Sequence, residues 1–313
     1  MRHVILPRML RIAALAASAS TMLALALLAG CGDAGPPQPR LSGVVLDGKL
    51  DEISGIAASG RFPDTFWVIQ DGGNDALLHA ISRRGSRLAT VRVAGVHNTD
   101  WEDIAAFTWQ GKHWLLLPDT GDNGGMRRTL QLHVVPEPDL VDGSQVRPAW
   151  SIAFRWPDGP RDCEAVAVDV AAGEVLLISK KRNPHELFSL PLHPAAGLQT
   201  ATRIALLAPP ADLSNNTADD SADARGRALG RQATAADLSP DGRTLAVLTY
   251  DRLLLYPRKP GEAWASAVTR APRTIALPWL QQAEAVAWLP DGKGLIATGE
   301  FSPAPLVYLP AGD

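Results

Sequence analysis

The sequence predicts an all-β fold, a β-propeller of five four-stranded blades, and three observations support this prediction. Five segments share a polar-x-polar opening, an apolar run, a turn and a second apolar run, at a spacing of about 50 residues. Each segment continues with further apolar runs of strand length, bounded by turn residues. A strand at 41–46 precedes the first segment, and the fifth segment has no fourth strand of its own. That N-terminal strand can complete the last sheet and close the ring, which protects the sheet edges.

The five repeats are recognised by two polar residues, separated by one residue, at the start of the first strand. These pairs are Glu52 and Ser54, Asp100 and Glu102, Asp162 and Glu164, Gln232 and Thr234, and Gln282 and Glu284. The last two repeats align without a gap through the turns at 239–242 and 289–292, which both contain Pro-Asp-Gly. Proline presets φ and glycine accepts a positive φ, so Pro-Asp-Gly between apolar runs predicts a turn.

The remaining strands follow in order within each repeat. We expect second strands at 66–71, 113–119, 175–180, 245–250 and 295–300, and third strands at 77–81, 130–135, 187–190, 253–256 and 306–309. Fourth strands are expected at 88–93, 149–156, 202–207 and 273–277. A six-bladed ring is the alternative, because irregular spacing could hide a degenerate blade between Glu164 and Thr234. Most of that long gap is the segment 211–231, whose Ser, Asn, Asp and Ala content predicts a disordered surface excursion.

Residues 1–30 have the pattern of a signal peptide. They contain three arginines and no acidic residue, followed by an apolar run to Gly30. A retained membrane anchor is the alternative, since the run is almost long enough to span a bilayer. The sequence Leu28-Ala29-Gly30-Cys31 resembles the lipobox of bacterial lipoproteins, which implies cleavage before Cys31 and lipidation of that cysteine. Gly32 in the next position implies sorting to the outer membrane, facing the periplasm, where acyl chains anchor the protein in the cell envelope.

The residues after the cysteine divide into a tether and the propeller. The segment 31–40 is rich in Gly and Pro and predicts a tether, and the propeller is expected over 41–313. The whole chain has 30 basic and 33 acidic residues, and cleavage would remove three arginines, leaving 27 against 33, a net charge of −6. This mildly acidic chain has no basic run, which excludes a nucleic-acid partner. Cys163 is predicted to be a small buried hydrophobe rather than a nucleophile.

The polar residues at strand ends predict an acidic rim at one mouth of the channel. In a propeller the start of the first strand and the end of the second reach the same mouth, and alternate residues of a strand lie on one side. The rim set is Glu52, Ser54, Asp71, Asp100, Glu102, Asp119, Asp162, Glu164, Thr234, Glu284 and Glu300, opposed by Lys180, Lys181 and Arg182. Trp101 lies between two of these acids and is a candidate for stacking on a ligand.

Crowded carboxylates need a balancing cation, and oxygen ligands suit Ca²⁺ better than Zn²⁺. We therefore expect Glu102, Glu164 and Glu284 to be metal ligands, and the ligand-binding rim to comprise Glu52, Asp71, Trp101, Glu102, Asp119, Glu164, Lys180, Lys181, Glu284 and Glu300. The alternative for each single acid is structural, because propellers also use repeated acids to accept hydrogen bonds from backbone N–H groups of another blade, with no ligand bound. The sequence alone leaves both interpretations open.

The first two repeats carry a family resemblance. Residues 51–57 followed by 66–71 resemble the first blade of bacterial phytase-like propellers, which include families with esterase-like activity. Residues 100–105 with 119–123 are similar to the second blade of exported propellers of the same kind. The resemblance covers roughly these two blades. It implies several Ca²⁺ ions paired with basic residues on phosphate, and here Lys180, Lys181 and Arg182 are the residues available for that role.

Three functions remain open. The leading hypothesis is a non-enzymatic, envelope-anchored propeller that binds a cation or a small polar ligand at the acidic rim, because carboxylates are abundant and no activated nucleophile is evident. The second is a hydrolase, either a calcium-assisted phosphoesterase or a glycoside hydrolase with two rim carboxylates. The third is a scaffold for an envelope protein on the propeller face, which an apolar, tryptophan-lined face would favour.

Overall fold

The computed structural model describes residues 38–213, 229–277 and 280–312, and these form five β-sheets. Blade 1 contains, from the channel outward, β2 (Ile53–Ala58), β3 (Thr65–Gln70), β4 (Leu77–Ser82), β5 (Arg87–Val93) and β9 (Gln145–Val146). Blade 2 contains β6 (Ala105–Trp109), β7 (Lys112–Asp119), β8 (Leu130–Pro136), β10 (Trp150–Arg155) and β14 (Gln199–Thr200). Blade 3 contains β11 (Cys163–Asp169), β12 (Glu174–Ser179), β13 (Glu186–Pro191) and β15 (Thr202–Leu206).

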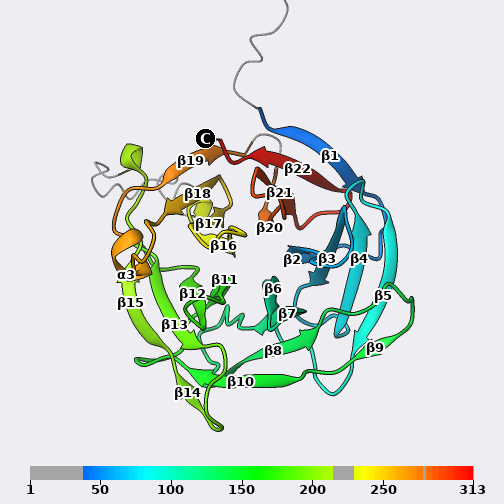
Figure 1. Cartoon of the computed structure of the whole chain (residues 1–313), viewed down its shortest axis with the longest axis horizontal. Helices are drawn as coiled ribbons and strands as arrows, with labels where there is room; N and C mark the ends of the chain where they lie inside the picture. Colours follow the sequence, from blue (N-terminus) through cyan, green and yellow to red (C-terminus); the bar gives the residue numbers. More distant parts are fainter. Residues whose placement is uncertain (1–37, 214–228, 278–279, 313) are drawn as a thin grey trace, which may run out of the picture. The chain divides into compact units, whose positions relative to one another are not determined.

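The last two blades complete the ring. Blade 4 contains β16 (Ala233–Leu238), β17 (Thr244–Thr249), β18 (Arg252–Pro257) and β19 (Arg273–Ala276). Blade 5 contains β20 (Ala283–Trp288), β21 (Gly294–Gly299), β22 (Ala304–Pro310) and, at its outer edge, β1 (Arg40–Val45). Two short helical segments, η1 (Ala211–Leu213) and α3 (Trp264–Ala267), lie between strands. The blades follow one another around the ring in sequence order, from blue to red (Figure 1).

The structure confirms the five-bladed ring and its closure by the N-terminal strand. β1 pairs antiparallel with β22, in a register that joins Arg40 to Tyr308 and Val45 to Ala304. The inner strands contact one another in a closed cycle, β2 to β6, β11, β16 and β20 and back to β2. Five apolar clusters fill the spaces between neighbouring blades. Closure therefore leaves each inner blade face covered by the next blade.

Two elements were not expected from the sequence. β9 and β14 are two-residue strands that pair in parallel with the outer strands β5 and β10, respectively. Each thus joins the blade that precedes the one to which its neighbours in the chain belong. A pairing of two residues has no alternation pattern of its own, so only the finished fold brings these segments together. Every other strand of the five blades lies within a few residues of its predicted range.

A β-bulge occurs at the same position in four inner strands. The pairing register skips Ser54, Glu164, Thr234 and Glu284, which are the second polar residues of repeats 1, 3, 4 and 5. The simple two-residue alternation that the sequence suggested is therefore broken at this point. A bulge re-aims the side chain of the extra residue, and these four side chains leave the plane of their own sheet.

Blade 2 differs from the other four, because its inner strand begins only at Ala105. The preceding Asp103 is fully buried and ties two other blades together. Its Oδ2 accepts hydrogen bonds from the backbone N–H groups of Val166 in β11 (2.9 Å) and Ala236 in β16 (3.1 Å). The segment before Ala105 keeps a single bridge to β7, between Trp101 and Asp119, and carries this carboxyl group toward β11 and β16.

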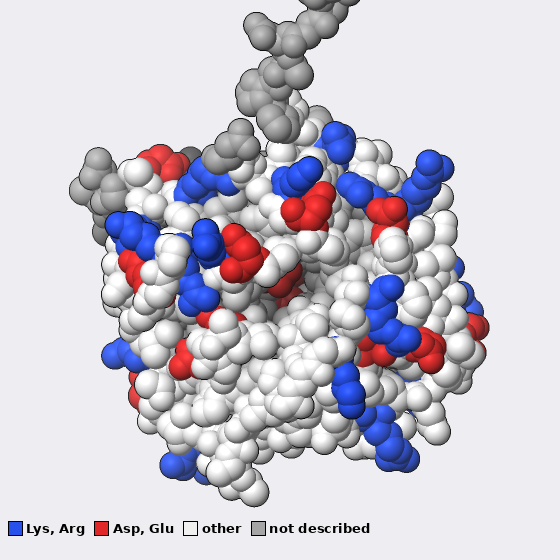
Figure 2. Space-filling model, in the orientation of Figure 1, with Lys and Arg blue, Asp and Glu red and all other residues white. Residues whose placement is uncertain are grey.

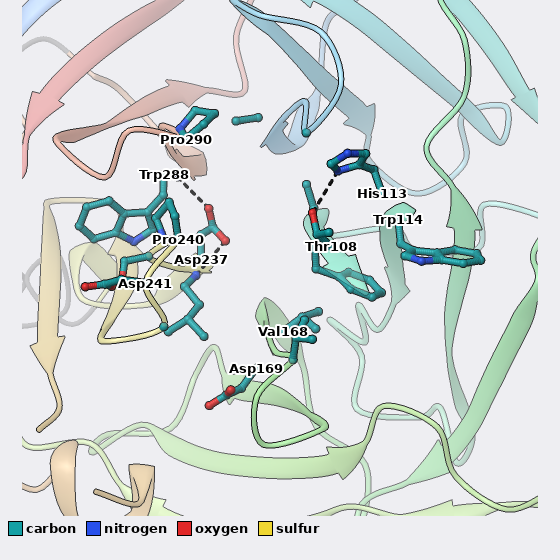
Figure 3. Close-up of a pocket in the computed structure, with 18 of the residues that line it drawn as sticks. Thr108, His113, Trp114, Val168, Asp169, Asp237, Pro240, Asp241, Trp288 and Pro290 are labelled. Atoms are coloured by element: carbon teal, nitrogen blue, oxygen red, sulfur yellow. Dashed lines mark hydrogen bonds between the residues drawn. The ribbon is translucent and has the colours of Figure 1, made fainter. Parts of the chain in front are cut away.

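The channel thus has two different ends. Figure 2, which views the same side as Figure 3, shows a hollow at the centre of that face, with acidic side chains inside it. The inner strands begin at the end where the acidic rim was predicted. Where they finish, they line a cavity of about 560 Å³ (Figure 3). Asp103 lies on the inner segment between these two ends.

Several predictions fall on residues outside the described ranges. These are the signal peptide over 1–30, Cys31, most of the tether, and the greater part of the excursion at 211–231. Cys163 is fully buried, as expected. Among the residues that the structure describes, no helix is both long enough and apolar enough to cross a membrane.

Candidate metal centre

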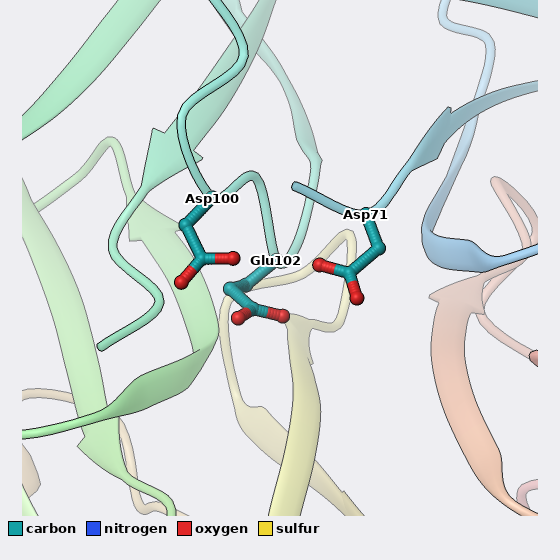
Figure 4. A group of neighbouring side chains, drawn as sticks. All are labelled: Asp71, Asp100 and Glu102. Atoms are coloured by element: carbon teal, nitrogen blue, oxygen red, sulfur yellow. The ribbon is translucent and has the colours of Figure 1, made fainter. Parts of the chain in front are cut away.

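Carboxylates converge where the inner strands begin. One carboxylate oxygen from each of Asp71, Asp100 and Glu102 lies within 4.8 Å of the others, and Glu102 belongs to a second such group with Asp162 and Glu164. Figure 4 shows the first three carboxyl groups gathered from two segments, Asp71 from one and Asp100 and Glu102 from the other. Glu102 is therefore shared by two adjacent acidic groups.

The local backbone brings the first group together. Asp71 follows β3, and its Oδ1 accepts a hydrogen bond from the N–H of Gly72 at 2.5 Å. The Asp100 carbonyl accepts hydrogen bonds from Thr120 and Gly121, which follow β7, at 3.1 and 3.2 Å. A Cβ atom on Gly121 would collide with the carboxyl groups of Glu102 and Asp100, so only glycine permits this approach.

The two acidic groups differ in their balancing charges. Lys180 forms an ion pair with Glu164, and Lys181 Nζ lies 2.9 Å from Asp162 Oδ2. No described lysine, arginine or histidine forms an ion pair with Asp71, Asp100 or Glu102. The first group thus has no direct ion pair, and Lys180 and Arg127 oppose its negative charge only from a distance.

The pKa values follow this arrangement. Burial raises the pKa of Asp100 to about 6, and the charge of Asp71 adds to the effect. Burial also raises the pKa of Asp71. The pKa of Glu102 lies well above its usual range because of burial, reinforced by Glu164, Asp71 and Asp100. All three groups would hold their protons more weakly if a cation lay between them.

Lys180 is the fixed cation of the neighbouring half. Burial alone would lower its pKa, but the carboxylates of Glu164 and Glu284 outweigh burial and raise it. Its ammonium lies 5.4 Å from the centre of the Tyr250 ring. Burial raises the pKa of Glu284 to about 7, with Lys180 and a hydrogen bond from Tyr250 opposing the rise. Glu284 therefore lies beside Lys180, outside both groups that converge to within 4.8 Å.

Burial raises the pKa of Glu164 as well, although Lys180 opposes the effect. The side chain is 3% exposed, and its Oε2 has no hydrogen-bond partner among the described residues. An unpartnered buried carboxylate oxygen at this position leaves one ligand atom unused.

The other predicted rim residues have separate partners. Asp119 forms an ion pair of 2.5 Å with Arg127, and Glu52 Oε2 accepts a hydrogen bond of 3.1 Å from Asn74. Glu300 is partly exposed, and burial raises its pKa, with Asp71 and Glu52 contributing. Arg182 is a largely exposed side chain that lies 3.8 Å from Glu186.

Two of the rim positions, which are hydroxyls rather than acids, join neighbouring blades by donating hydrogen bonds. The Ser54 hydroxyl donates to the Trp101 carbonyl of blade 2 (2.9 Å), and the Thr234 hydroxyl donates to the Ala283 carbonyl of blade 5 (2.6 Å). Trp101, expected as a surface for stacking, is fully buried in the cluster between blades 1 and 2. Because its ring packs inside this cluster, Trp101 presents no face to the channel mouth, although it lies between two acids in the sequence.

Sequence reasoning did not select Tyr250 or Arg127. Tyr250 stands directly after its second strand, the position that Asp71, Lys180 and Glu300 have in other blades, so the repeat alignment contained a usable signal. Arg127 lies in the loop after β7, where no repeat pattern applies. Its guanidinium neutralises Asp119 and also donates to the Gly121 carbonyl at 2.7 Å.

No family model matches the sequence, and no curated protein matches it. Among solved structures, the PQQ-bound aldose sugar dehydrogenase of Streptomyces coelicolor is similar, with a TM-score of 0.50 and 12% identity over 88% of this chain and 99% of that one. Hydrazine synthase of Kuenenia stuttgartiensis has a TM-score of 0.44 and 14% identity, over 83% and 72% of the two chains. The likeness to the dehydrogenase supports the propeller fold alone.

Proposed function

We propose that this chain is an exported, lipid-anchored β-propeller of the cell envelope that binds Ca²⁺ at its acidic mouth, through Asp71, Asp100 and Glu102. The bound cation would in turn hold an anionic or polyhydroxylated ligand. The observation that carries the proposal is the convergence of these three carboxylates within 4.8 Å without a basic partner among the described residues. Hard oxygen ligands of this kind favour Ca²⁺ over Zn²⁺.

The proposed ligand set differs from the one suggested by the repeat. Glu102 is common to both, and Glu164 remains a neighbour through its unpartnered Oε2. Glu284 is engaged with Lys180 and Tyr250, so its negative charge already has a counter-ion. Asp71 and Asp100 take its place because they are partly exposed and form no ion pair among the described residues, which lets a hydrated ion reach them.

A second candidate function is calcium-assisted hydrolysis of a phosphoester. It is supported by a cavity of about 360 Å³ lined by Lys180, Lys181, Arg182 and Arg231, beside the acidic mouth. Basic side chains next to a cation could orient a phosphate, while the cation polarises its oxygen. Turnover of a chromogenic phosphoester that depends on both Ca²⁺ and Lys181 would favour this candidate over simple binding.

The test is thermal unfolding of residues 32–313 with and without Ca²⁺. Binding to the folded state should add about 2.7 kcal/mol of stability at a hundredfold excess over the dissociation constant. The double variant Asp71→Asn, Asp100→Asn should lose this gain and should be at least as stable as the wild type without Ca²⁺, because the mutual repulsion is removed.

Asp64→Asn is the matched control. Asp64 is a largely exposed acid in the turn between β2 and β3, at the opposite end of the blade, and its φ of 52° suits asparagine. This variant should keep the full response to Ca²⁺. An unresponsive wild type, or a double variant that still responds, would remove the cation site from the proposal.

Anchoring is tested separately. The Cys31→Ser variant should not incorporate labelled palmitate and should leave the membrane fraction, because the acylated residue is gone. Recovery of acylated variant protein from membranes would contradict the lipid anchor and leave the cation site untouched.

A further inference from the structure

The cavity at the other end of the channel is a second candidate site. Its volume is about 560 Å³, and its walls come from the far ends of the inner strands and the turns after them. Figure 3 shows Trp288, Pro240 and Pro290 on one side of it, and Thr108, His113 and Trp114 on the other. The two prolines belong to the matched Pro-Asp-Gly turns of blades 4 and 5. A repeated turn thus provides one wall of the cavity.

The lining is acidic and contains no lysine or arginine among the residues that the structure describes. Glu137 is one of its four carboxylates, and it is used within the protein. It accepts hydrogen bonds from the Ser59 hydroxyl, Trp67 Nε1 (2.9 Å) and the Gly60 N–H (3.2 Å), which fasten blade 2 to a turn of blade 1.

Two further carboxylates are also engaged. Asp169 Oδ2 lies 2.7 Å from the Arg258 guanidinium and accepts a hydrogen bond of 2.9 Å from Trp264 Nε1. Asp241 accepts hydrogen bonds from the Ser239 hydroxyl (2.6 Å) and the Arg243 N–H (3.0 Å) within its own turn. His113, the titratable donor of the lining, lies 3.0 Å from Thr108 Oγ1.

Asp237 is the remaining carboxylate, and it stands where the four other repeats have alanine, at Ala57, Ala105, Ala167 and Ala287. Its Oδ1 accepts the Leu238 N–H (2.8 Å) and its Oδ2 accepts the Trp288 N–H (2.7 Å). A carboxylate can accept about four hydrogen bonds, so each oxygen keeps one unused lone pair. The side chain lies in the cavity wall and has no ion pair among the described residues, and burial raises the pKa of Asp237 to about 7, so the carboxylate is ionised above that pH.

We propose that this cavity binds a small organic cation, with its ammonium group against Asp237 and its apolar body against Pro240, Pro290 and Val168. An anion is disfavoured, because the lining offers carboxylates and no basic side chain. The carboxylate attracts the ammonium group, and the two prolines and Val168 supply apolar contact. Both parts of such a ligand would therefore be matched.

The site is independent of the proposed Ca²⁺ centre. The two lie at opposite ends of the inner strands, and Asp103 bridges β11 and β16 between them. Occupation of one therefore requires no residue of the other, and either proposal can fail alone.

The test is calorimetric titration of the purified full-length protein with choline chloride, in saturating Ca²⁺ so that the acidic mouth is occupied. The neutral isostere 3,3-dimethylbutan-1-ol and the neutral sugar glucose are titrated in parallel, at equal ionic strength. At pH 8, where the Asp237 carboxylate is ionised, we expect choline to bind about tenfold more tightly than the isostere, because this carboxylate attracts the charge of the ammonium group.

Variants locate the binding. Asp237→Asn should weaken choline binding about tenfold while keeping an acceptor for the Trp288 N–H. Asp291→Asn, in the exposed matching turn of blade 5, and the double variant Asp71→Asn, Asp100→Asn should bind choline as the wild type does. Asp237→Ala introduces the residue that the other repeats have at this position, and it provides a second variant if Asp237→Asn does not fold.

Three results would overturn the proposal. They are equal binding of choline and its isostere, wild-type binding by both Asp237 variants, and binding of glucose without choline. The last would make the cavity a site for a neutral sugar. Loss of choline binding in the Asp71 and Asp100 double variant alone would assign the signal to the acidic mouth.

Discussion

One position of the repeat has two different roles around the ring. Blades 1 and 4 have hydroxyls at the bulge, Ser54 and Thr234, and each donates to a backbone carbonyl of the next blade. Blades 3 and 5 have carboxylates there, Glu164 and Glu284, and both face Lys180 at the channel mouth. The backbone is bulged in the same way in all four blades. The side chain alone therefore decides whether the position joins blades or builds a site.

The two roles have opposite energetic signs. A buried hydroxyl with a satisfied acceptor stabilises the fold by roughly 1 kcal/mol. Clustered buried carboxylates raise one another's pKa, which means that the folded state disfavours their charged forms. Such an arrangement persists where a counter-ion balances it, and Lys180 is the counter-ion that the chain itself provides.

Removing that counter-ion should have the largest effect. Lys180→Met leaves Glu164 and Glu284 buried without an opposing charge, and breaking a buried ion pair in this way costs about 3 kcal/mol. Urea unfolding at pH 8 measures the loss. Ca²⁺ should restore part of it, because the cation can neutralise the same carboxylates.

Lys293→Met is the control for that variant. Lys293 is an exposed residue in the turn before β21, so the stability of the Lys293→Met variant should stay close to that of the wild type. If both variants are equally stable, the carboxylates of the mouth need no counter-ion, and the contrast between the two kinds of bulge disappears.

The sequence predicted the fold well because its signals are local. Apolar runs and Pro-Asp-Gly turns are properties of a few adjacent residues, and they placed nearly all strands. The bulges were not predicted, since a skipped residue leaves no mark on the composition of a strand. Asp103 was likewise not selected from the sequence, and its role in joining blades through Val166 and Ala236 is evident only in the structure.

The blades with a hydroxyl at the bulge, blades 1 and 4, provide the next prediction. Thr234→Val keeps the shape of the side chain and removes the donor to the Ala283 carbonyl, so we expect a loss of about 1–2 kcal/mol in urea unfolding. Thr298→Val is a matched comparison, because Thr298 is equally buried and its hydroxyl has no partner among the described residues.

Thr298→Val should be neutral or stabilising, since it removes an unpaired buried polar atom. Both variants should keep the calcium response of the wild type. Equal losses for the two threonines would mean that the hydrogen bond between blades 4 and 5 contributes nothing, and that packing alone holds this seam.

The candidate site was predicted less completely than the fold. The acids at strand ends were identified, but their grouping depends on distances between blades, which no local pattern encodes. Asp237 carried a signal that repeat alignment could have used, because an acid stands where Ala57, Ala167 and Ala287 stand elsewhere. The cavity beside it is lined by residues from all five blades and could only emerge from the assembled ring.

The smallest expected effect concerns pH and the first acidic group. Burial raises the pKa of Asp100 to about 6 in the folded protein, from 3.8 without such burial. Between these values the folded state binds more protons than the unfolded state. Stability without Ca²⁺ should therefore fall as pH rises through this window, and Glu284, whose pKa is raised to about 7, extends the fall toward neutrality.

Asp100→Asn tests this sign, because asparagine neither gains nor loses a proton. Its unfolding free energy in EDTA should fall less steeply than that of the wild type between pH 4 and 6, with a modest difference because solvent screens the partly exposed Asp100. Ca²⁺ should reverse the order at higher pH, since it binds the ionised carboxylate and stabilises the wild type more than the variant. Parallel pH profiles for the two proteins, with and without Ca²⁺, would show that Asp100 stays ionised throughout and plays no part in holding the cation.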